Sequence, residues 1–245
     1  MMCLSDIGDA VRFLTRVPMP SLPAARADEP AGFGAAAFPL VGLLLGVVAL
    51  GADVATGELP HGVRDVGILA LWALLTGALH YDGLADVLDA LGPSSREERL
   101  RVMRDATLGT FAVLGLVFVV AVEIASLGAL DGHARHRVLL VAPMLGRLAM
   151  LLAAFEAPRA REDGLGAEFS RRLGAREVLV AGAFAVIVAV LLWGLRGAGA
   201  IAVVGCIALA VRRGSVAAFG GISGDVLGAC GKLAEVAVLV LGTVR

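Results

Sequence analysis

Three aspartates, Asp82, Asp86 and Asp89, carry the clearest chemical signal in this sequence. They lie at or just beyond the end of an apolar run, and offsets of four and seven residues place all three carboxylates on one face if the segment is helical. Like charges on one face repel each other, so a cation would stabilise the cluster. The pattern therefore indicates a divalent metal ion that holds a phosphorylated substrate, or else an acidic, solvated helix end.

Further residues of the same chemical kind occur in two later segments. Asp105 stands at the start of the next apolar run, and Asp225 follows a glycine-rich stretch in which Gly224 lets backbone approach a ligand closely. His80 could act as the base for an attacking hydroxyl, although a lone histidine at a helix end is commonly structural. Arginines near these acids are candidate phosphate contacts, or they reflect only the basic loops that membrane topology requires. They are Arg104, Arg159 and Arg161.

The elements that must position these residues are membrane helices. With 58% hydrophobic and 18% charged residues, and a mean hydropathy of +0.87, the chain is predicted to be an all-α integral membrane protein in the lipid bilayer. Apolar runs near the length of a span predict a polytopic bundle of six or seven transmembrane helices in a single domain, 1–245. The runs are 31–52, 66–81, 106–122, 138–155, 178–195, 197–211 and, as the weakest, 226–244.

The N-terminal residues predict a different kind of helix. Leu4, Ile7, Val11 and Leu14 recur at helical spacing, which is typical of a short amphipathic helix in the membrane interface or against the bundle. A formal net charge of -1 and the lack of a basic domain give no indication of nucleic-acid binding.

Lysine and arginine predict the orientation of the spans. With a cytoplasmic N-terminus and seven spans, most of the basic residues fall in cytoplasmic segments, as expected for the inner membrane of a bacterium. This topology places three loops on one cytoplasmic face: the segment after Asp82, the segment 158–166 and the segment 220–225. We therefore expect the carboxylates and arginines of these loops to form one site.

Carboxylates beside arginines at a membrane surface fit diphosphate chemistry. Metal ions can neutralise a diphosphate and stabilise charge on its leaving group, and transfer of a phosphoryl-type group needs little else from the protein. Magnesium is the expected ion, because the ligands are hard oxygens and no cysteine or histidine cluster is present.

Several motifs resemble, in order, those of the cobalamin synthase family, whose members are adenosylcobinamide-GDP ribazoletransferases. The resemblance spans nearly the whole chain, and the order and spacing of the motifs make it specific. The matching segments are FLTRVPMP at 13–20, FPLVG at 38–42, LHYDGLAD at 79–86, RDATLGTF at 104–111, APMLGR at 142–147, GLG at 164–166 and GDVLGA at 224–229.

The resemblance implies a magnesium-dependent membrane transferase of the last steps of cobalamin assembly. Such an enzyme joins adenosylcobinamide-GDP to α-ribazole, or to its 5'-phosphate, and releases GMP. In this chain the implied catalytic residues are Asp82 and His80, with Gly224 and Asp225 in substrate binding. Magnesium would be held by Asp82, Asp86, Asp89 and Asp105, and phosphate by Arg104, Arg159 and Arg161.

The chain also departs from the family pattern, and other interpretations stay open. Ala90 replaces a usual glycine, and Lys232 stands where an acidic residue is common, either altering a ligand contact or simply pairing with Glu235. Glu123 and Arg147 inside predicted spans would also suit an ion-coupled transporter, although no inverted repeat is visible. CDP-alcohol phosphotransferases and prenyltransferases are alternative membrane transferases, but their aspartate motifs match this sequence only in part.

Overall fold

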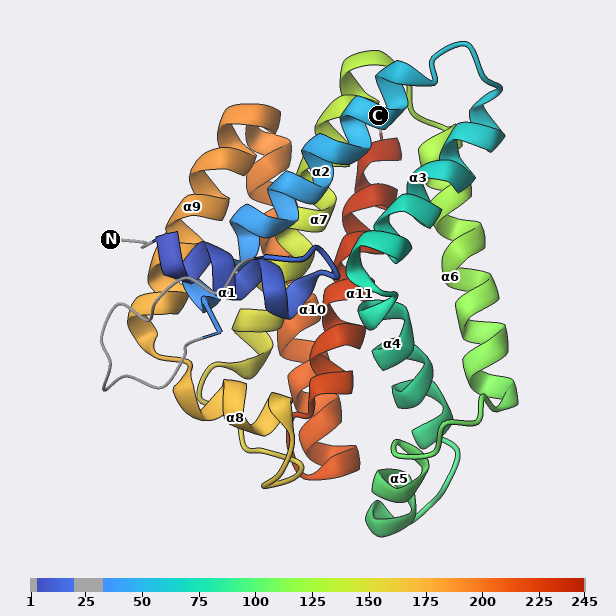
Figure 1. Cartoon of the computed structure of the whole chain (residues 1–245). Helices are drawn as coiled ribbons and strands as arrows, with labels where there is room; N and C mark the ends of the chain where they lie inside the picture. The colour runs from blue at the N-terminus through green and yellow to red at the C-terminus, as the bar shows by residue number, and fades with distance from the viewer. Residues whose placement is uncertain (1–3, 20–32, 245) are drawn as a thin grey trace.

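The computed structural model describes residues 4–19 and 33–244, and its elements are helical throughout (Figure 1). This confirms the predicted all-α bundle. The described elements are α1 (Leu4–Leu14), η1 (Ala35–Ala37), α2 (Phe38–Ala55), α3 (His61–Thr76), α4 (Leu79–Ala90), α5 (Arg96–Val102), α6 (Thr110–Gly128), α7 (Gly132–Ala154), α8 (Leu165–Arg172), α9 (Ala175–Trp193), α10 (Leu195–Phe219) and α11 (Gly224–Thr243).

The long apolar helices confirm a multi-pass membrane protein. Among the described residues, 6 helices are long and apolar enough to cross a membrane, and the pair α3 and α4 would bring the total to 7 if counted as one span. The prediction of six or seven spans is therefore correct. The weakest predicted span, 226–244, corresponds to α11, whose charged residues Lys232 and Glu235 are buried and paired.

The predicted span 66–81 is wrong in one respect, because the chain breaks inside it. Gly77 and Ala78 both adopt left-handed backbone conformations, which end α3 at Thr76 and start α4 at Leu79. The two helices are bent by 89° relative to each other. Apolar composition continues across the break, so hydropathy alone does not reveal it, whereas a glycine after a helix is a common stop signal. The aspartates consequently lie on a separate short helix with its own direction.

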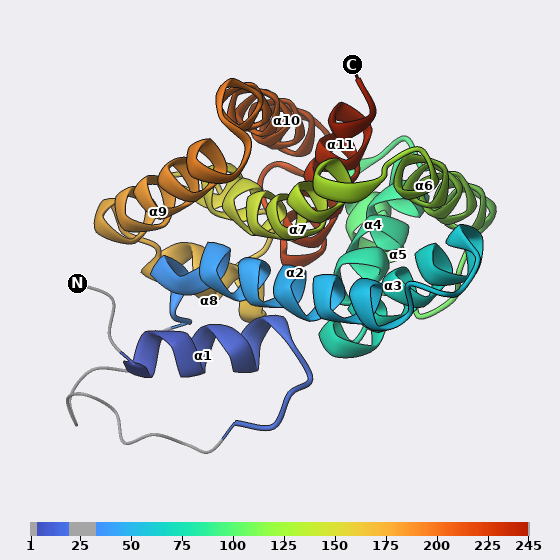
Figure 2. The ribbon, with the colours of Figure 1, turned by 90° about the horizontal axis from the view of Figure 1, so that it is seen from above.

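Two helices, α7 and α11, form the centre of the bundle (Figure 2). α2 and α9 pack along α7, while α6 and α10 lie outside α11 and leave apolar side chains such as Phe118 and Leu209 exposed, as lipid contact requires. α1 runs across the outside of α2 and buries Ala10 and Leu14, which confirms the predicted amphipathic helix.

Buried charges at one end of the bundle are neutralised in a cluster. Arg135 of α7 contacts Asp53 of α2 at 2.9 Å and Asp65 of α3 at 2.7 Å, and Arg64 contacts Asp53 at 2.6 Å. All but Arg64 are almost completely buried. An isolated charge in this environment costs free energy, so the ion pairs favour keeping the ends of the three helices in contact.

A glycine sets the distance between α4 and α11. A Cβ atom at Gly83 would lie 2.6 Å from the backbone oxygen of Asp225. A larger residue would therefore push the two helices apart, and small residues at such crossings are typical of membrane helices. This close approach puts Asp82 and Asp86 of α4 beside the N-terminus of α11.

We expect Gly83→Ala to disturb this contact and to lower the stability of the detergent-purified protein by about 1 to 3 kcal/mol, because the added methyl group overpacks a tight crossing. Gly67→Ala in α3 is the matched control, since nothing lies within 4 Å of a Cβ atom built there. The thermal midpoint of each variant checks the prediction, which is contradicted if the two substitutions have the same effect.

Candidate functional site

A cavity of about 460 Å³ opens where α4 and α11 begin. Its wall combines parts of α1, α4, α8 and α11 with the loop that precedes α8. Charged and polar members of the lining include Arg12, Arg16, Asp82, Arg161, Ser223 and Asp225. The lining of the cavity thus contains both carboxylates and guanidinium groups.

Two aspartates, Asp82 and Asp225, form the acidic wall of this cavity, and a third, Asp86, lies near them. Asp82 and Asp225 line it directly, and the half-buried Asp86 lies within electrostatic range of both. Arg161 offsets part of this charge through a contact of 3.0 Å to Asp225. Two of the predicted substrate-binding residues, Arg161 and Asp225, therefore touch each other at the cavity, and Gly224 lines it beside them.

Backbone pairing brings the second and third predicted loops together. The amide of Ala160 donates to the carbonyl of Ile222 at 3.0 Å, and the amide of Ile222 donates to the carbonyl of Pro158 at 2.8 Å. Gly221 makes this possible, because a Cβ atom there would lie 2.4 Å from the carbonyl oxygen of Pro158. The expectation that these loops meet is confirmed.

Arg96 joins the first loop to the other two. Its side chain donates to the carbonyl of Phe219 at 2.8 Å and to the carbonyl of Ala160 at 3.4 Å. Nearby, Arg99 donates to the carbonyls of Pro93 and Ala218. The sequence gave no indication that these two arginines bind main-chain carbonyls.

Asp89 lies away from the cavity and stabilises a helix end. Its two carboxylate oxygens accept hydrogen bonds from the amide of Gly109 at 2.6 Å and the amide of Ala112 at 2.9 Å. These amides belong to the first turn of α6, whose donors lack partners within the helix. The structure therefore shows Asp89 as a cap supplied by another helix and does not bring it to Asp82.

Asp105 is also separate from the acidic wall. It is exposed, and its side chain accepts hydrogen bonds from the backbone amide and the hydroxyl of Thr107 at 3.0 and 2.8 Å. These bonds hold the pKa of Asp105 below its usual range, because they favour the charged carboxylate. The four aspartates predicted to share a metal thus divide into Asp82 and Asp86 at the cavity and Asp89 and Asp105 outside it.

Three other predicted site residues do not line the cavity. His80 is buried, with its ring beside Gly231, and the charges of Arg147 and Lys232 act on it. Arg104 contacts Asp163 at 3.4 Å, and Arg159 contacts Glu162 at 3.1 Å. In contrast, Arg12 and Arg16 line the cavity, although neither was predicted to be a site residue. The available clue was that Arg16 lies within the FLTRVPMP motif and that Arg12 directly precedes it.

The carboxylate oxygens at the acidic wall are ligands of the kind that magnesium prefers. Within 4–19 and 33–244, no three histidine, cysteine or acidic side chains are arranged to hold a metal ion on their own. Magnesium, however, is usually held by one or two carboxylates together with substrate phosphates and water, rather than by a complete protein cage. Asp82, Asp86 and Asp225 offer only hard oxygen ligands and repel one another, which fits such an ion.

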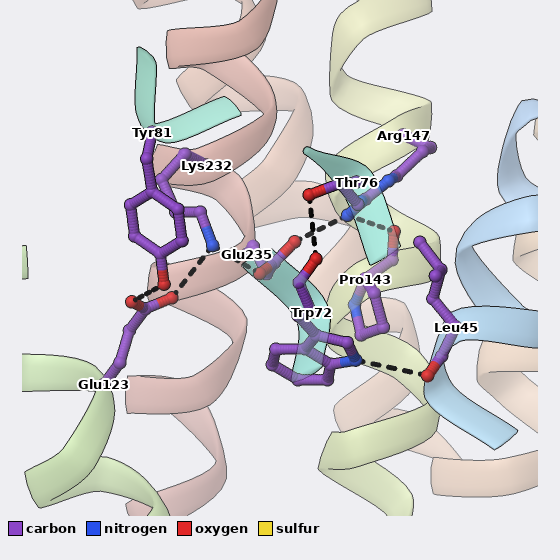
Figure 3. Close-up of polar contacts among 9 residues, drawn as sticks. All are labelled: Leu45, Trp72, Thr76, Tyr81, Glu123, Pro143, Arg147, Lys232 and Glu235. Carbon is purple, nitrogen blue, oxygen red and sulfur yellow. Dashed lines mark hydrogen bonds and ion pairs between the residues drawn. The ribbon is translucent and has the colours of Figure 1, made fainter. Parts of the chain in front are cut away.

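Lys232 lies in the bundle interior and not at the cavity. Its ammonium group is 2.6 Å from Glu235 and 3.1 Å from Glu123, and Arg147 is 2.6 Å from Glu235 (Figure 3). The expected pairing of Lys232 with Glu235 is confirmed. Glu123 and Arg147, the charges that suggested a transporter, are accounted for by the same buried ion pairs.

Comparison with known proteins identifies close similarity over nearly the whole chain. The family model described as cobalamin-5-phosphate synthase matches residues 6–243. A protein of Geotalea daltonii named adenosylcobinamide-GDP ribazoletransferase is 37% identical, with 94% of each chain covered. Proteins with the same name from Syntrophobacter fumaroxidans and Pseudomonas aeruginosa are 38% and 37% identical and cover 96% and 94% of this chain. No solved structure matches the chain.

The contacts of Asp89 lead to a prediction that separates capping from metal binding. We expect Asp89→Ala to lower stability by about 0.5 to 2 kcal/mol, as for other lost helix caps, whereas Asp89→Asn keeps an oxygen acceptor and loses less. Thermal unfolding of the two purified variants measures the difference. If Asp89→Asn lost activity completely while unfolding like the wild type, the assignment of Asp89 as a cap alone would be wrong.

Proposed function

The chain belongs to the cobalamin-5-phosphate synthase family, and we propose that it joins adenosylcobinamide-GDP to α-ribazole, or to α-ribazole 5'-phosphate, with release of GMP. Its relatives are named for this transfer. The observation that supports the proposal within the chain is the lining of the cavity, which combines the carboxylates of Asp82 and Asp225 with the guanidinium groups of Arg16 and Arg161. A diphosphate substrate needs cations around it, and a transferase acting on it needs oxygen ligands nearby.

In the proposed reaction, a hydroxyl oxygen of the ribazole forms a bond to the phosphorus of the cobinamide phosphate. The bond from that phosphorus to the bridging oxygen of the diphosphate breaks, and GMP leaves with that oxygen. The hydroxyl proton passes to a base. Asp82 is the candidate for this role, because its carboxylate is exposed in the cavity. His80 is a weaker candidate, since it is buried behind the cavity wall.

The arginines of the cavity would bind the phosphate oxygens. Arg161 is held by Asp225 and so has a fixed position before substrate arrives. Arg16 packs over Gly77 at the break between α3 and α4, where a Cβ atom would lie 2.4 Å from the guanidinium Nε. Magnesium, held by Asp82 and Asp86 with Asp225 close by, would neutralise charge on the diphosphate and on the departing GMP.

We propose that the cavity faces the cytoplasm of a cell whose inner membrane holds the protein. The basic residues are concentrated in the segments that surround the cavity, as the positive-inside rule requires of a cytoplasmic face. A nucleotide-activated substrate would also be available on that side.

The transfer itself can be tested with purified protein. Adenosylcobinamide-GDP, α-ribazole and magnesium are incubated with the protein, and GMP and the cobamide are measured together. We expect Asp82→Asn to reduce the rate by about 100-fold or more, because it removes a charge that acts at the reacting phosphate. Asp131→Asn, which changes an exposed aspartate outside the cavity lining, is the control. Normal transfer and normal magnesium dependence in Asp82→Asn would exclude the metal assignment.

Arg161 yields a separate prediction about substrate binding. Arg161→Gln is expected to raise the KM for adenosylcobinamide-GDP by about 10-fold, since hydrogen bonds to charged groups contribute about 1.5 to 3 kcal/mol. Arg213→Gln removes a charge from an exposed site on α10 that does not line the cavity and serves as the control. Initial rates over a range of substrate concentrations provide the measurement. An unchanged KM in Arg161→Gln would show that this guanidinium does not contact the substrate.

A further inference from the structure

A chain of polar contacts joins Tyr81 to charged groups that are buried in the bundle (Figure 3). The hydroxyl of Tyr81 donates to Glu123 at 2.6 Å, and Lys232 bridges Glu123 and Glu235 at 3.1 and 2.6 Å. Arg147 completes the chain with a contact of 2.6 Å to Glu235. Glu123, Lys232, Glu235 and Arg147 are all nearly inaccessible to solvent, and their two negative and two positive charges balance.

Tyr81 connects this chain to the helix that carries the aspartates. The other four members of the chain lie on α6, α7 and α11, which are long apolar helices. Tyr81, in contrast, lies in the first turn of the short helix α4. Its ring is held as well as its hydroxyl, because the ammonium nitrogen of Lys232 lies 4.0 Å from the ring centroid. Tyr81 is therefore fixed at two points by groups that cannot easily move.

The orientation of α4 depends on such contacts because the helix lacks support from the chain before it. The 89° bend separates it from α3, and it is only 12 residues long. Gly83, near the middle of α4, contacts the start of α11. Asp89, at the far end of α4, accepts hydrogen bonds from the start of α6. Tyr81 supplies a further attachment, at the residue immediately before Asp82.

We propose that Tyr81 is a positioning residue, which fixes the rotation of α4 through the buried chain and so directs Asp82 and Asp86 toward the cavity. This inference rests on the function proposed above. No member of the buried chain lines the cavity, so none of them contacts the substrate there. A change at Tyr81 should therefore alter the rate of the chemical step more than the binding of either substrate.

Tyr81→Phe tests this inference, because it retains the ring over Lys232 and removes the hydroxyl that binds Glu123. We expect kcat to fall by about 10-fold, since small misplacements of reacting groups cost rates of this order or more. The KM values for adenosylcobinamide-GDP and for the ribazole should stay within about twofold of wild type, because substrate contacts are unchanged. A wild-type kcat in this variant would overturn the inference.

Trp72→Phe is the matched control for a loss that is merely structural. It also removes one buried hydrogen bond, from the indole nitrogen of Trp72 to the carbonyl of Leu45 at 3.1 Å, but on α3 and before the break (Figure 3). We expect it to lower the thermal midpoint without a selective fall in kcat. An equal fall in kcat in both variants would show that general destabilisation, and not the position of Asp82, is responsible.

Glu123→Gln provides a second test that does not depend on the folding of Tyr81→Phe. The amide oxygen still accepts a hydrogen bond from the hydroxyl of Tyr81, so kcat should stay within about threefold of wild type. A decrease as large as that expected for Tyr81→Phe would assign the effect to the charge of Glu123 and would refute the positioning role. If wild-type protein forms neither GMP nor cobamide, the proposed function itself fails, which is a different outcome.

Discussion

The close approach of α4 and α11 at Gly83 is the constraint on which the candidate site depends. It places Asp82 and Asp86 of one helix beside Asp225 of the other, although Asp225 is far from the other two in the sequence. Such a concentration of negative charge is unfavourable unless cations balance it. Arg161 supplies part of that balance. The negative charge that it leaves unbalanced would suit a metal ion bound together with a phosphorylated substrate.

The same electrostatic requirement governs the interior of the bundle. Ionisable groups in an apolar environment are costly when unpaired, and both buried clusters in the described residues satisfy this requirement with opposite charges. One cluster connects the ends of α2, α3 and α7, and the other connects α4, α6, α7 and α11. Lys232, which departs from the family pattern, belongs to the second cluster and pairs with Glu123 and Glu235. The charge of Lys232 is therefore paired within the bundle interior, and Lys232 does not line the cavity.

The loops at the cavity are organised mainly by backbone contacts. Arg96 and Arg99 bind main-chain carbonyls, and the segment 158–160 pairs with Ile222. A basic loop can therefore bind protein carbonyls rather than phosphate, and composition does not distinguish the two. The arginines that do line the cavity come from α1, from the residues just after it and from the loop before α8. Residues from the first and last parts of the chain are needed to form the cavity.

Composition and periodicity by themselves determined the all-α membrane bundle, the number of spans, the amphipathic helix α1 and the identity of the acidic segment. These features depend on the lengths of apolar runs and on the spacing of residues along the chain, both of which can be read from the sequence. The tertiary structure alone decided which carboxylates meet. Helical spacing put Asp82, Asp86 and Asp89 on one face, yet Asp89 caps α6 while Asp225 joins the other two. The break at Gly77 and Ala78 and the contact at Gly83 set those partners, and each depends on packing between segments that are distant along the chain.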